Sequence, residues 1–357
     1  AMPTAPRFDV TILGASGFGG GELYRLLLGH PGTASLRGVA RSAAGQPVAR
    51  THPHLAGLVD EVFLAEVDWE RLAASPHPVL FAALPHGEFA RLHEDLVAAW
   101  TAHGLADRLT VIDLSGDFRL DDADSFRVAY GQAHPCPERL GEYLYGLSEV
   151  ARESLRGAKR IACPGCFATA IELALLPLAD LVRELRPGFV AVTAVTGSSG
   201  SGLAPSATTH HPTRDGDFRA YKVLGHQHLS EIEMLLRREG FAGRIAFVPQ
   251  SGPFVRGIHV TATFELPEGL SPDSLAAAYR ARYPTGGFVR IDEVPRLKSL
   301  VGSNRVELAL KSDGRHAVVL LTLDNLMKGM AGQAVQNLNL ALGWPEASGL
   351  LAAAAYP

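Results

Sequence analysis

The sequence predicts an α/β fold: a Rossmann-like, doubly wound parallel sheet followed by a second, α+β domain. Three observations lead to this prediction. The chain opens with a short β-rich run, a glycine-rich turn and a helical pattern, and strand-like and helix-like stretches then alternate. Beyond residue 165 the pattern changes to longer strand-like runs separated by polar loops. With 357 residues the chain is long enough for two packed domains.

Each element of the first domain has a recognisable pattern. FDVTIL at 8–13 is a strand, followed by GASGFGG and a helix that stops at Gly-His-Pro. Further strands are expected at 34–40, 78–84 and 108–116, with a helix around 86–100. Strands separated by helices pair in parallel, because each crossover returns the chain to the same edge of the sheet.

The second domain is expected to be a mixed sheet. Its strand-like runs are FVAVTAVTG, GRIAFVPQ, RGIHVTATFEL and HAVVLLTLDN. A helical pattern begins at Met327 and is expected to return to the first domain. We therefore expect a cofactor domain at 1–165, completed by a C-terminal helix at 325–357, and a catalytic domain at 166–324.

The composition excludes several classes of protein. The chain is 47% hydrophobic and 20% charged, with 33 basic and 37 acidic residues and a net charge of −4, so neither nucleic acid nor a membrane is an expected partner. No apolar run of about 18 residues and no signal-peptide pattern is present, which predicts a cytoplasmic protein. Three cysteines are too few for a disulfide framework.

The glycine-rich turn predicts a dinucleotide site. Gly14, Gly17 and Gly20 form GxxGxxG between a strand and a helix, where backbone amides can approach a pyrophosphate. The alternative is a tight structural turn. The second strand ends at Arg41 and Ser42 rather than at an acidic residue, which favours the 2′-phosphate of NADP over NAD; the alternative is a solvated surface arginine.

A second glycine-rich stretch, TGSSGSG at 196–202, also follows a strand. The residues after it lack helical apolar spacing, so it is expected to shape an active site or to be a plain flexible loop rather than to bind a dinucleotide.

Two cysteines stand three residues apart in CPGC. Without a second cysteine pair, a structural metal site or a redox dithiol is disfavoured, and no metal is expected. Cys166 is expected in the first turn of a helix, where unpaired amides and the helix dipole stabilise a thiolate. It is therefore a candidate nucleophile, with a buried inert cysteine as the alternative. Cys163, inside the apolar run, is expected to be inert.

A thiolate nucleophile needs an acid/base partner. Four histidines follow within a short stretch: His210, His211, His226 and His228. The last two precede a helical pattern with Glu231 in its first turn, so one imidazole is expected to hold a proton while Glu231 orients it. His210 and His211 fit surface positions equally well.

Eight motifs together resemble the N-acetyl-γ-glutamyl-phosphate reductases, relatives of the aspartate-semialdehyde dehydrogenases. They run in order from about residue 8 to 345: LGASGFGGGELYRLL, ALPHGEFA, VIDLSGDFRL, YGLSE, PGCFAT, HQHLSEIE, PFVRGI and DNLMKGMAGQAVQNLN. The resemblance implies that the second domain is a catalytic and dimerisation domain and that the protein is a dimer or tetramer.

The resemblance implies an NADPH-linked reduction of an acyl phosphate to a semialdehyde, through a thioester on Cys166. A histidine of the His226/His228 pair would handle the protons, assisted by Glu231. Ser115, Arg119 and Arg256 would lie near the substrate. The implied cofactor residues are Gly14, Ser16, Gly17, Phe18, Gly19, Arg41, Ser42, Pro85, Asn325 and Gly329.

The sequence departs from the family pattern at two places. Cys163 replaces the usual Asn three residues before the nucleophile, with Phe167 and Ala168 for Tyr and Pro. The loop from 197 to 228 resembles the lysine-synthesis branch, in which α-aminoadipyl phosphate is carried on a small acidic protein. Arg214, Arg219 and Lys222 would then form a basic lip for that carrier; an ordinary solvated loop is the alternative.

The leading hypothesis is a carrier-linked aminoadipate 6-phosphate reductase. The alternative is the N-acetyl-γ-glutamyl-phosphate reductase of arginine synthesis, or one enzyme with both activities. Aspartate-semialdehyde dehydrogenase is a weaker match to HQHLSEIE and KGMAGQAVQN. A non-catalytic NADP-sensing protein would have no use for a helix-capped thiolate beside histidines.

Overall fold

The computed structural model describes residues 6–183 and 188–356, which divide into two compact units. The first holds 6–127, 132–164 and 330–351, and the second holds 128–131, 165–183, 188–329 and 352–356. The chain passes from the first unit to the second between Pro164 and Gly165, and returns between Gly329 and Met330. Cys166 is therefore the second residue after the first of these crossings.

The first unit is a Rossmann-like α/β layer structure, as predicted. Its six-stranded sheet is parallel in the order β2-β1-β3-β4-β6-β5. The strands are β1 (Phe8–Leu13), β2 (Thr33–Val39), β3 (Pro78–Ala82), β4 (Thr110–Asp113), β5 (Leu144–Tyr145) and β6 (Arg160–Ala162). β5 and β6 have two and three residues, too short to leave a periodic signal in the sequence.

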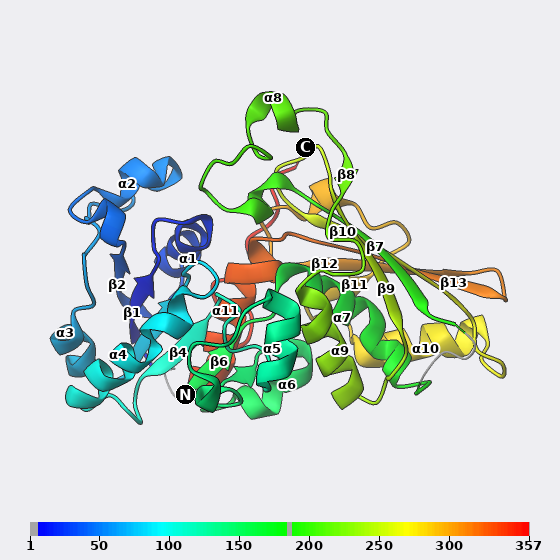
Figure 1. The fold of residues 1–357 in the computed structure, drawn as a ribbon, viewed down its shortest axis with the longest axis horizontal. Coiled ribbons are helices and arrows are strands. Elements are labelled where there is room, and N and C mark those ends of the chain that lie inside the picture. Colours follow the sequence, from blue (N-terminus) through cyan, green and yellow to red (C-terminus); the bar gives the residue numbers. More distant parts are fainter. Residues whose placement is uncertain (1–5, 184–187, 357) are drawn as a thin grey trace. The chain divides into compact units, whose positions relative to one another are not determined.

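Helices join and cover these strands (Figure 1). They are α1 (Phe18–Leu28), α2 (Val48–Thr51), α3 (Trp69–Ala74), α4 (Glu88–Ala102), α5 (Ala123–Tyr130), whose last residues lie in the second unit, α6 (Ser148–Leu155) and α11 (Gly332–Leu342). Strands β1, β3 and β4 are buried almost throughout, as expected of parallel strands covered on both faces.

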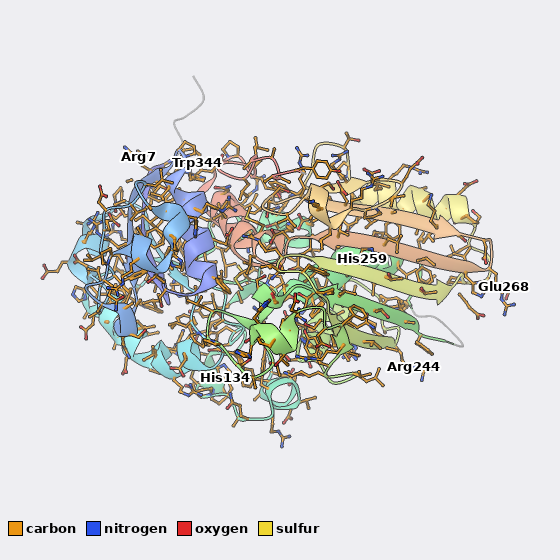
Figure 2. The ribbon with its side chains drawn as sticks, turned by 90° about the horizontal axis from the view of Figure 1, so that it is seen from above. Arg7, His134, Arg244, His259, Glu268 and Trp344 are labelled. Atoms are coloured by element: carbon orange, nitrogen blue, oxygen red, sulfur yellow. The ribbon has the colours of Figure 1, made fainter. Side chains whose placement is uncertain are left out.

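The C-terminal helix is much shorter than the expected span of 325–357. A π-helical turn over Met327–Ala331 precedes α11, and α11 ends at Leu342 because Gly343 adopts a left-handed φ of 75° and Pro345 follows. Residues 352–356 belong to the second unit. Trp344, beside Arg7 in Figure 2, donates from Nε1 to the carbonyl of Pro6 at 2.8 Å, so the end of α11 is attached to the start of β1.

The second unit is the mixed α+β structure that was predicted. Its seven-stranded sheet has the order β11-β12-β13-β10-β7-β9-β8. The strands are β7 (Val190–Thr196), β8 (Arg219–Ala220), β9 (Ile245–Ser251), β10 (Ile258–Glu265), β11 (Val289–Ile291), β12 (Val306–Ser312) and β13 (His316–Leu323). Burial alternates along β7, β9 and β10, which is the pattern of a sheet with one covered face.

The covered face packs on helices (Figure 1). These are α7 (Cys166–Ala179), α9 (His228–Arg238) and α10 (Pro272–Arg282), while the one-turn α8 (His211–Arg214) lies in the long connection before β8. Nearly every residue of α7 is buried, because it contacts β10, β13, α9 and α10. None of the described helices is long and apolar enough to cross a membrane.

Candidate active site

The thiol of Cys166 stands at the first position of α7. Gly165 is the N-cap residue, with φ −66° and ψ 155°, and its carbonyl accepts from the backbone N–H of Thr169 at 2.8 Å. Cys166 is partly exposed, whereas Cys136 and Cys163 are buried. The first amides of a helix have no acceptor within the helix, so a negative charge on this sulfur is stabilised by them and by the dipole of a buried helix.

Glu231 connects α9 to the loop at residues 163–165 between β6 and α7, which we call the cysteine loop. Its side chain is 1% exposed, and its Oε2 accepts from the backbone N–H of Gly165 at 2.9 Å. Its Oε1 lies 3.8 Å from Nε2 of His228. One buried carboxylate thus binds the residue before Cys166 and lies beside a neighbouring imidazole.

The His228 ring lies directly against Gly165. A Cβ atom at residue 165 would come within 2.6 Å of Cε1 and 2.7 Å of Cδ2 of that ring, so glycine is required for this approach. The backbone N–H of His228 donates to Nδ1 of His226 at 3.2 Å. The two histidines therefore occupy different places, and His228 is the one that contacts the cysteine loop.

His226 is surrounded by aromatic rings. Its centroid lies 5.3 Å from Phe167, 5.6 Å from Phe247 and 5.8 Å from Tyr221, each in an edge-on arrangement. Burial, and next the neighbouring His228, lower the pKa of His226 to about 3. The imidazole is neutral near pH 7, and because Nδ1 accepts a hydrogen bond its proton is on Nε2.

The π-helical turn contacts the base of the nucleophile. A Cβ atom on Gly329 would lie 2.9 Å from Cβ and 3.3 Å from Cα of Cys166, so only glycine lets the two backbones approach this closely. Gly329 was expected to bind the cofactor, but the contact that the structure gives it is with Cys166. π-helical turns are rare and are frequently found at functional sites.

Arg256 is held beside this turn by Asp324. The guanidinium donates from Nε and Nη2 to the two carboxylate oxygens at 3.0 and 3.2 Å, and Asp324 is fully buried. The same carboxylate accepts from the backbone N–H groups of Gly302, Leu326 and Met327. The Arg256 side chain is 23% exposed, so a rigidly oriented cation with access to solvent lies at the end of β13.

The loop TGSSGSG leads from β7 into a 3₁₀ turn and not into a long helix, which is the setting of a dinucleotide fingerprint. It forms a 3₁₀ turn over Ser198–Ser201 whose amides donate to the carbonyls of Phe254 and Val255. Asn325 is 1% exposed and joins it to the rest of the site, donating to Oγ of Ser199 at 3.0 Å and accepting from the N–H of Gly257 at 2.6 Å. The hydrogen bonds of Asn325 join loops of the second unit, and its expected contact with the cofactor stays a prediction.

The expected basic lip is wrong for Arg214. Its side chain is buried and donates to the carbonyl of Gly252 at 2.5 Å, because the loop folds inward after α8. Arg219 is partly exposed and pairs with Asp217 at 2.7 Å, while the exposed Lys222 donates to Gln227 at 2.9 Å. His210 and His211 are exposed. Only Arg219 and Lys222 of the three predicted cations reach the surface.

In the first unit, the glycine-rich turn has the geometry expected of a dinucleotide site. Gly14 has a φ of +73°, and a Cβ there would lie 2.8 Å from the carbonyl carbon of Ala83. Gly17 is the N-cap of α1, so Ser16, Phe18 and Gly19 surround the helix start. The carboxyl ends of β1 and β3 adjoin here, and Pro85 in the loop after β3 is exposed. A pyrophosphate would meet backbone amides and a helix N-terminus at this edge.

His52 supports the turn from behind, a role that sequence reasoning missed. Its Nε2 lies 2.8 Å from the carbonyl oxygen of Ala15, and its ring occupies the space that a Cβ on Gly21 would need. Arg41 and Ser42 are exposed in a 3₁₀ turn directly after β2. Nothing in the sequence around His52 indicates that it contacts Ala15 and Gly21 of the glycine-rich turn.

Ser115 and Arg119 lie after β4, in the first unit. The Ser115 hydroxyl donates to Asp113 at 2.6 Å, and Arg119 donates from Nε to the carbonyl of Cys163 at 2.6 Å and from Nη2 to that of Leu114 at 3.2 Å. Arg119 is 9% exposed. Burial, and next the charge of Asp117, raise the pKa of Asp113 to about 6. Both predicted substrate residues are thus engaged in holding the loops at the ends of β4 and β6.

The fold and the site define a nicotinamide-dependent oxidoreductase: the chain belongs to the semialdehyde dehydrogenase family. Residues 9–158 match its NAD-binding domain and residues 166–325 match its dimerisation domain. This confirms the family expected from the sequence motifs.

Two relatives illustrate the range of activities. The [LysW]-L-2-aminoadipate 6-phosphate reductase of Deinococcus radiodurans is 38% identical over 96% of both chains. The N-acetyl-gamma-glutamyl-phosphate reductase of Mycobacterium avium is 41% identical, also over 96% of both. Aspartate semialdehyde dehydrogenase II of Vibrio cholerae shares the fold, with a TM-score of 0.67 at 15% identity over 94% of this chain and 98% of that one.

Proposed function

We propose that the protein is an NADPH-dependent reductase that converts the 6-phosphate of a carrier-linked L-2-aminoadipate to the semialdehyde. The observation that carries the proposal is the contact set around Cys166: a helix-start thiol, Gly165 bonded to the buried Glu231, and His228 packed on Gly165. Relatives named as reductases of carrier-linked aminoadipate phosphate support the substrate class.

In the proposed reaction the Cys166 thiolate attacks the acyl carbon, the carbonyl oxygen takes up negative charge, and phosphate leaves to give a thioester on Sγ. Amides at the start of α7 face the developing oxyanion. NADPH, when bound, supplies the hydride that reduces the thioester. The resulting thiohemiacetal releases the semialdehyde and returns the thiolate.

We assign the acid/base role to His228 and a positioning role to His226. His228 contacts the residue before Cys166, and its Nε2 lies 3.8 Å from Oε1 of Glu231. His226 is enclosed by rings and holds the backbone of His228 through Nδ1. Arg256, fixed by Asp324, is the proposed site for the phosphate or a carboxylate of the substrate.

We also propose that an acidic carrier protein binds the enzyme, through two of the three predicted cations. Arg219 and Lys222 are the exposed cations of the loop from 197 to 228, and an acidic carrier would meet them there. Homo-oligomers formed through the second unit are expected, since that unit matches a dimerisation domain.

The reverse reaction tests the substrate. Purified protein, NADP⁺ and phosphate are mixed with either carrier-linked aminoadipate semialdehyde or N-acetylglutamate semialdehyde, and NADPH absorbance is followed. We expect turnover with the carrier-linked aldehyde and a kcat/KM at least about tenfold lower with the acetylated one, the discrimination that one missing contact produces. Equal or greater turnover with the acetylated aldehyde would assign the enzyme to arginine synthesis.

The cofactor preference is tested at Arg41. Removing a guanidinium that binds a 2′-phosphate costs about 1.5–3 kcal/mol, so Arg41→Ala is expected to raise KM for NADPH by roughly 10- to 100-fold and leave KM for NADH unchanged. Arg50→Ala, an exposed arginine of α2 in the same unit, is the matched control. If Arg41→Ala changes both KM values equally, the arginine does not read the 2′-phosphate.

A further inference from the structure

Three side chains of the first unit bring metal-ligand atoms together outside the proposed active site. They are His93 and Glu94 of α4 and Cys136 of the loop after α5, and their donor atoms all lie within 4.8 Å of one another. His93 and Cys136 are 1% and 3% exposed, whereas the Glu94 side chain is 53% exposed. The cluster therefore has a buried nitrogen and sulfur and a carboxylate open to solvent.

We propose that His93, Glu94 and Cys136 form a zinc site with a water as the fourth ligand. Imidazole, thiolate and carboxylate are the three ligand types that Zn²⁺ takes in proteins. Tetrahedral bond lengths of about 2.0–2.3 Å place donor atoms roughly 3.3–3.8 Å apart. Nδ1 of His93 and Oε1 of Glu94 are already 3.4 Å apart, so rotation of the exposed carboxylate and a small movement of the sulfur complete the geometry.

The His93 ring is already oriented for a metal ion. Its Nε2 lies 3.1 Å from the hydroxyl oxygen of Tyr143, and its Nδ1 lies 3.4 Å from Oε1 of Glu94, which accepts a hydrogen bond from it in the metal-free protein. When zinc takes Nδ1, the imidazole proton moves to Nε2 and donates to Tyr143. In a metal-bound histidine, the ring N–H that does not face the metal usually donates to a hydrogen-bond partner of this kind. Phe118 packs on the ring with centroids 4.6 Å apart, which fixes the plane of the imidazole.

Cys136 is held by a chain of hydrogen bonds through His134, labelled in Figure 2. The backbone N–H of Cys136 donates to Nδ1 of His134 at 3.1 Å, and Nε2 of His134 lies 2.9 Å from the carbonyl oxygen of Asp117. The thiol makes a contact of 3.5 Å with the carbonyl of Ala90, which is long and readily exchanged for a metal bond. Binding replaces the thiol proton by Zn²⁺ and releases that proton to solvent.

Arg139 opposes the metal and so determines how tightly it binds. Its guanidinium donates to both oxygens of Glu94, at 2.9 and 3.1 Å, and also pairs with Glu142 at 3.1 Å. A zinc ion must share or displace this partner and is repelled by its charge. The proposal therefore predicts an unusual result: removal of a surface arginine strengthens zinc binding.

Zinc binding to the metal-free full-length chain tests the proposal. The background is Cys166→Ala, so that the active-site thiol does not bind the metal. Zinc chloride is titrated by calorimetry, and Co²⁺ is used as a second probe because its thiolate charge-transfer absorption requires a cysteine ligand. We expect one equivalent of zinc, a thiolate band with Co²⁺, binding weakened by about tenfold or more in Glu94→Gln, and binding strengthened in Arg139→Gln.

Two further variants complete the test. Cys136→Ser is expected to abolish the Co²⁺ thiolate band, and His103→Ala, which removes an exposed histidine just after α4, is expected to change nothing. Glu94 and Arg139 are partly exposed, so their variants leave the core intact if Cys136→Ser does not fold. No zinc retained by the Cys166→Ala chain, or a stoichiometry and affinity unaffected by Glu94→Gln and Arg139→Gln, overturns the proposal.

Discussion

Replacing Cys166 by alanine is expected to abolish reductase activity, with a loss in kcat of about 10⁴-fold or more. In the proposed reaction hydride reduces a thioester on Sγ, so without the sulfur no bond can hold the acyl group. Binding of the cofactor is expected to be unchanged, because the predicted dinucleotide residues before α7 belong to the first unit. Single-turnover assays and a separate NADPH titration measure the two effects.

Two controls separate chemistry from packing. Cys166→Ser keeps a side chain of similar shape but has a far less acidic nucleophile, and it is expected to be nearly as inactive as the alanine variant. Alkylation of the native protein should modify one thiol and stop turnover in proportion, since Cys136 and Cys163 are buried. Substantial activity in either variant at position 166, or full activity after stoichiometric alkylation, would contradict the assignment.

Cys166 could be predicted as a candidate nucleophile because its signal is local. PGC before a helical pattern places the cysteine at a helix start, and GxxGxxG between strand and helix places the cofactor turn. Strand-like runs likewise located eight of the thirteen strands of the described residues in order. The strands β5, β6, β8 and β11 are too short to have a period, and the seven-residue β12 was missed. A structural feature that a few consecutive residues determine can be predicted from a single sequence.

The contacts around the nucleophile were not predictable, because they join distant segments. Nothing in the local sequence of Gly329 indicates that it lies against Cys166, and the expectation that it binds the cofactor came from a motif alone. The burial of Arg214 likewise depends on a contact with a segment distant in the sequence. A charged residue among polar neighbours suggests exposure, but a single backbone acceptor at Gly252 suffices to hold its side chain inside.

The assignment of the acid/base role to His228 and not to His226 also required the structure. The sequence HQH gives no reason to prefer either histidine as the acid/base group. Only Gln227 separates them, but His226 lies before α9 and His228 is its first residue, so their side chains enter different surroundings. His226 enters a group of aromatic rings and loses basicity through burial, while His228 meets the cysteine loop. The proposed roles therefore follow from the ring of His228 lying against Gly165 and the ring of His226 being enclosed by Phe167, Tyr221 and Phe247.

Replacing Gly165 by alanine tests this assignment and is expected to lower kcat by roughly 100-fold, the effect of displacing a catalytic group by about 1 Å. The new Cβ would lie 2.6 Å from Cε1 of His228, well inside van der Waals contact, so the ring must move away from the nucleophile. The free energy of unfolding is expected to fall by about 1–3 kcal/mol, as for an overpacked site. Steady-state kinetics and thermal unfolding measure the two changes.

The interpretation depends on whether Gly165→Ala lowers kcat by displacing His228. If it does, Gly165→Ala has little further effect in a His228→Ala background, and the double-mutant cycle shows a coupling close to the whole effect of the single change. Gly287→Ala, in a turn of the same unit where a Cβ meets no atom nearer than 3.6 Å, controls for the backbone change itself. Additive losses in the cycle would mean that the alanine acts on the cysteine loop directly, and that the acid/base role belongs to another group.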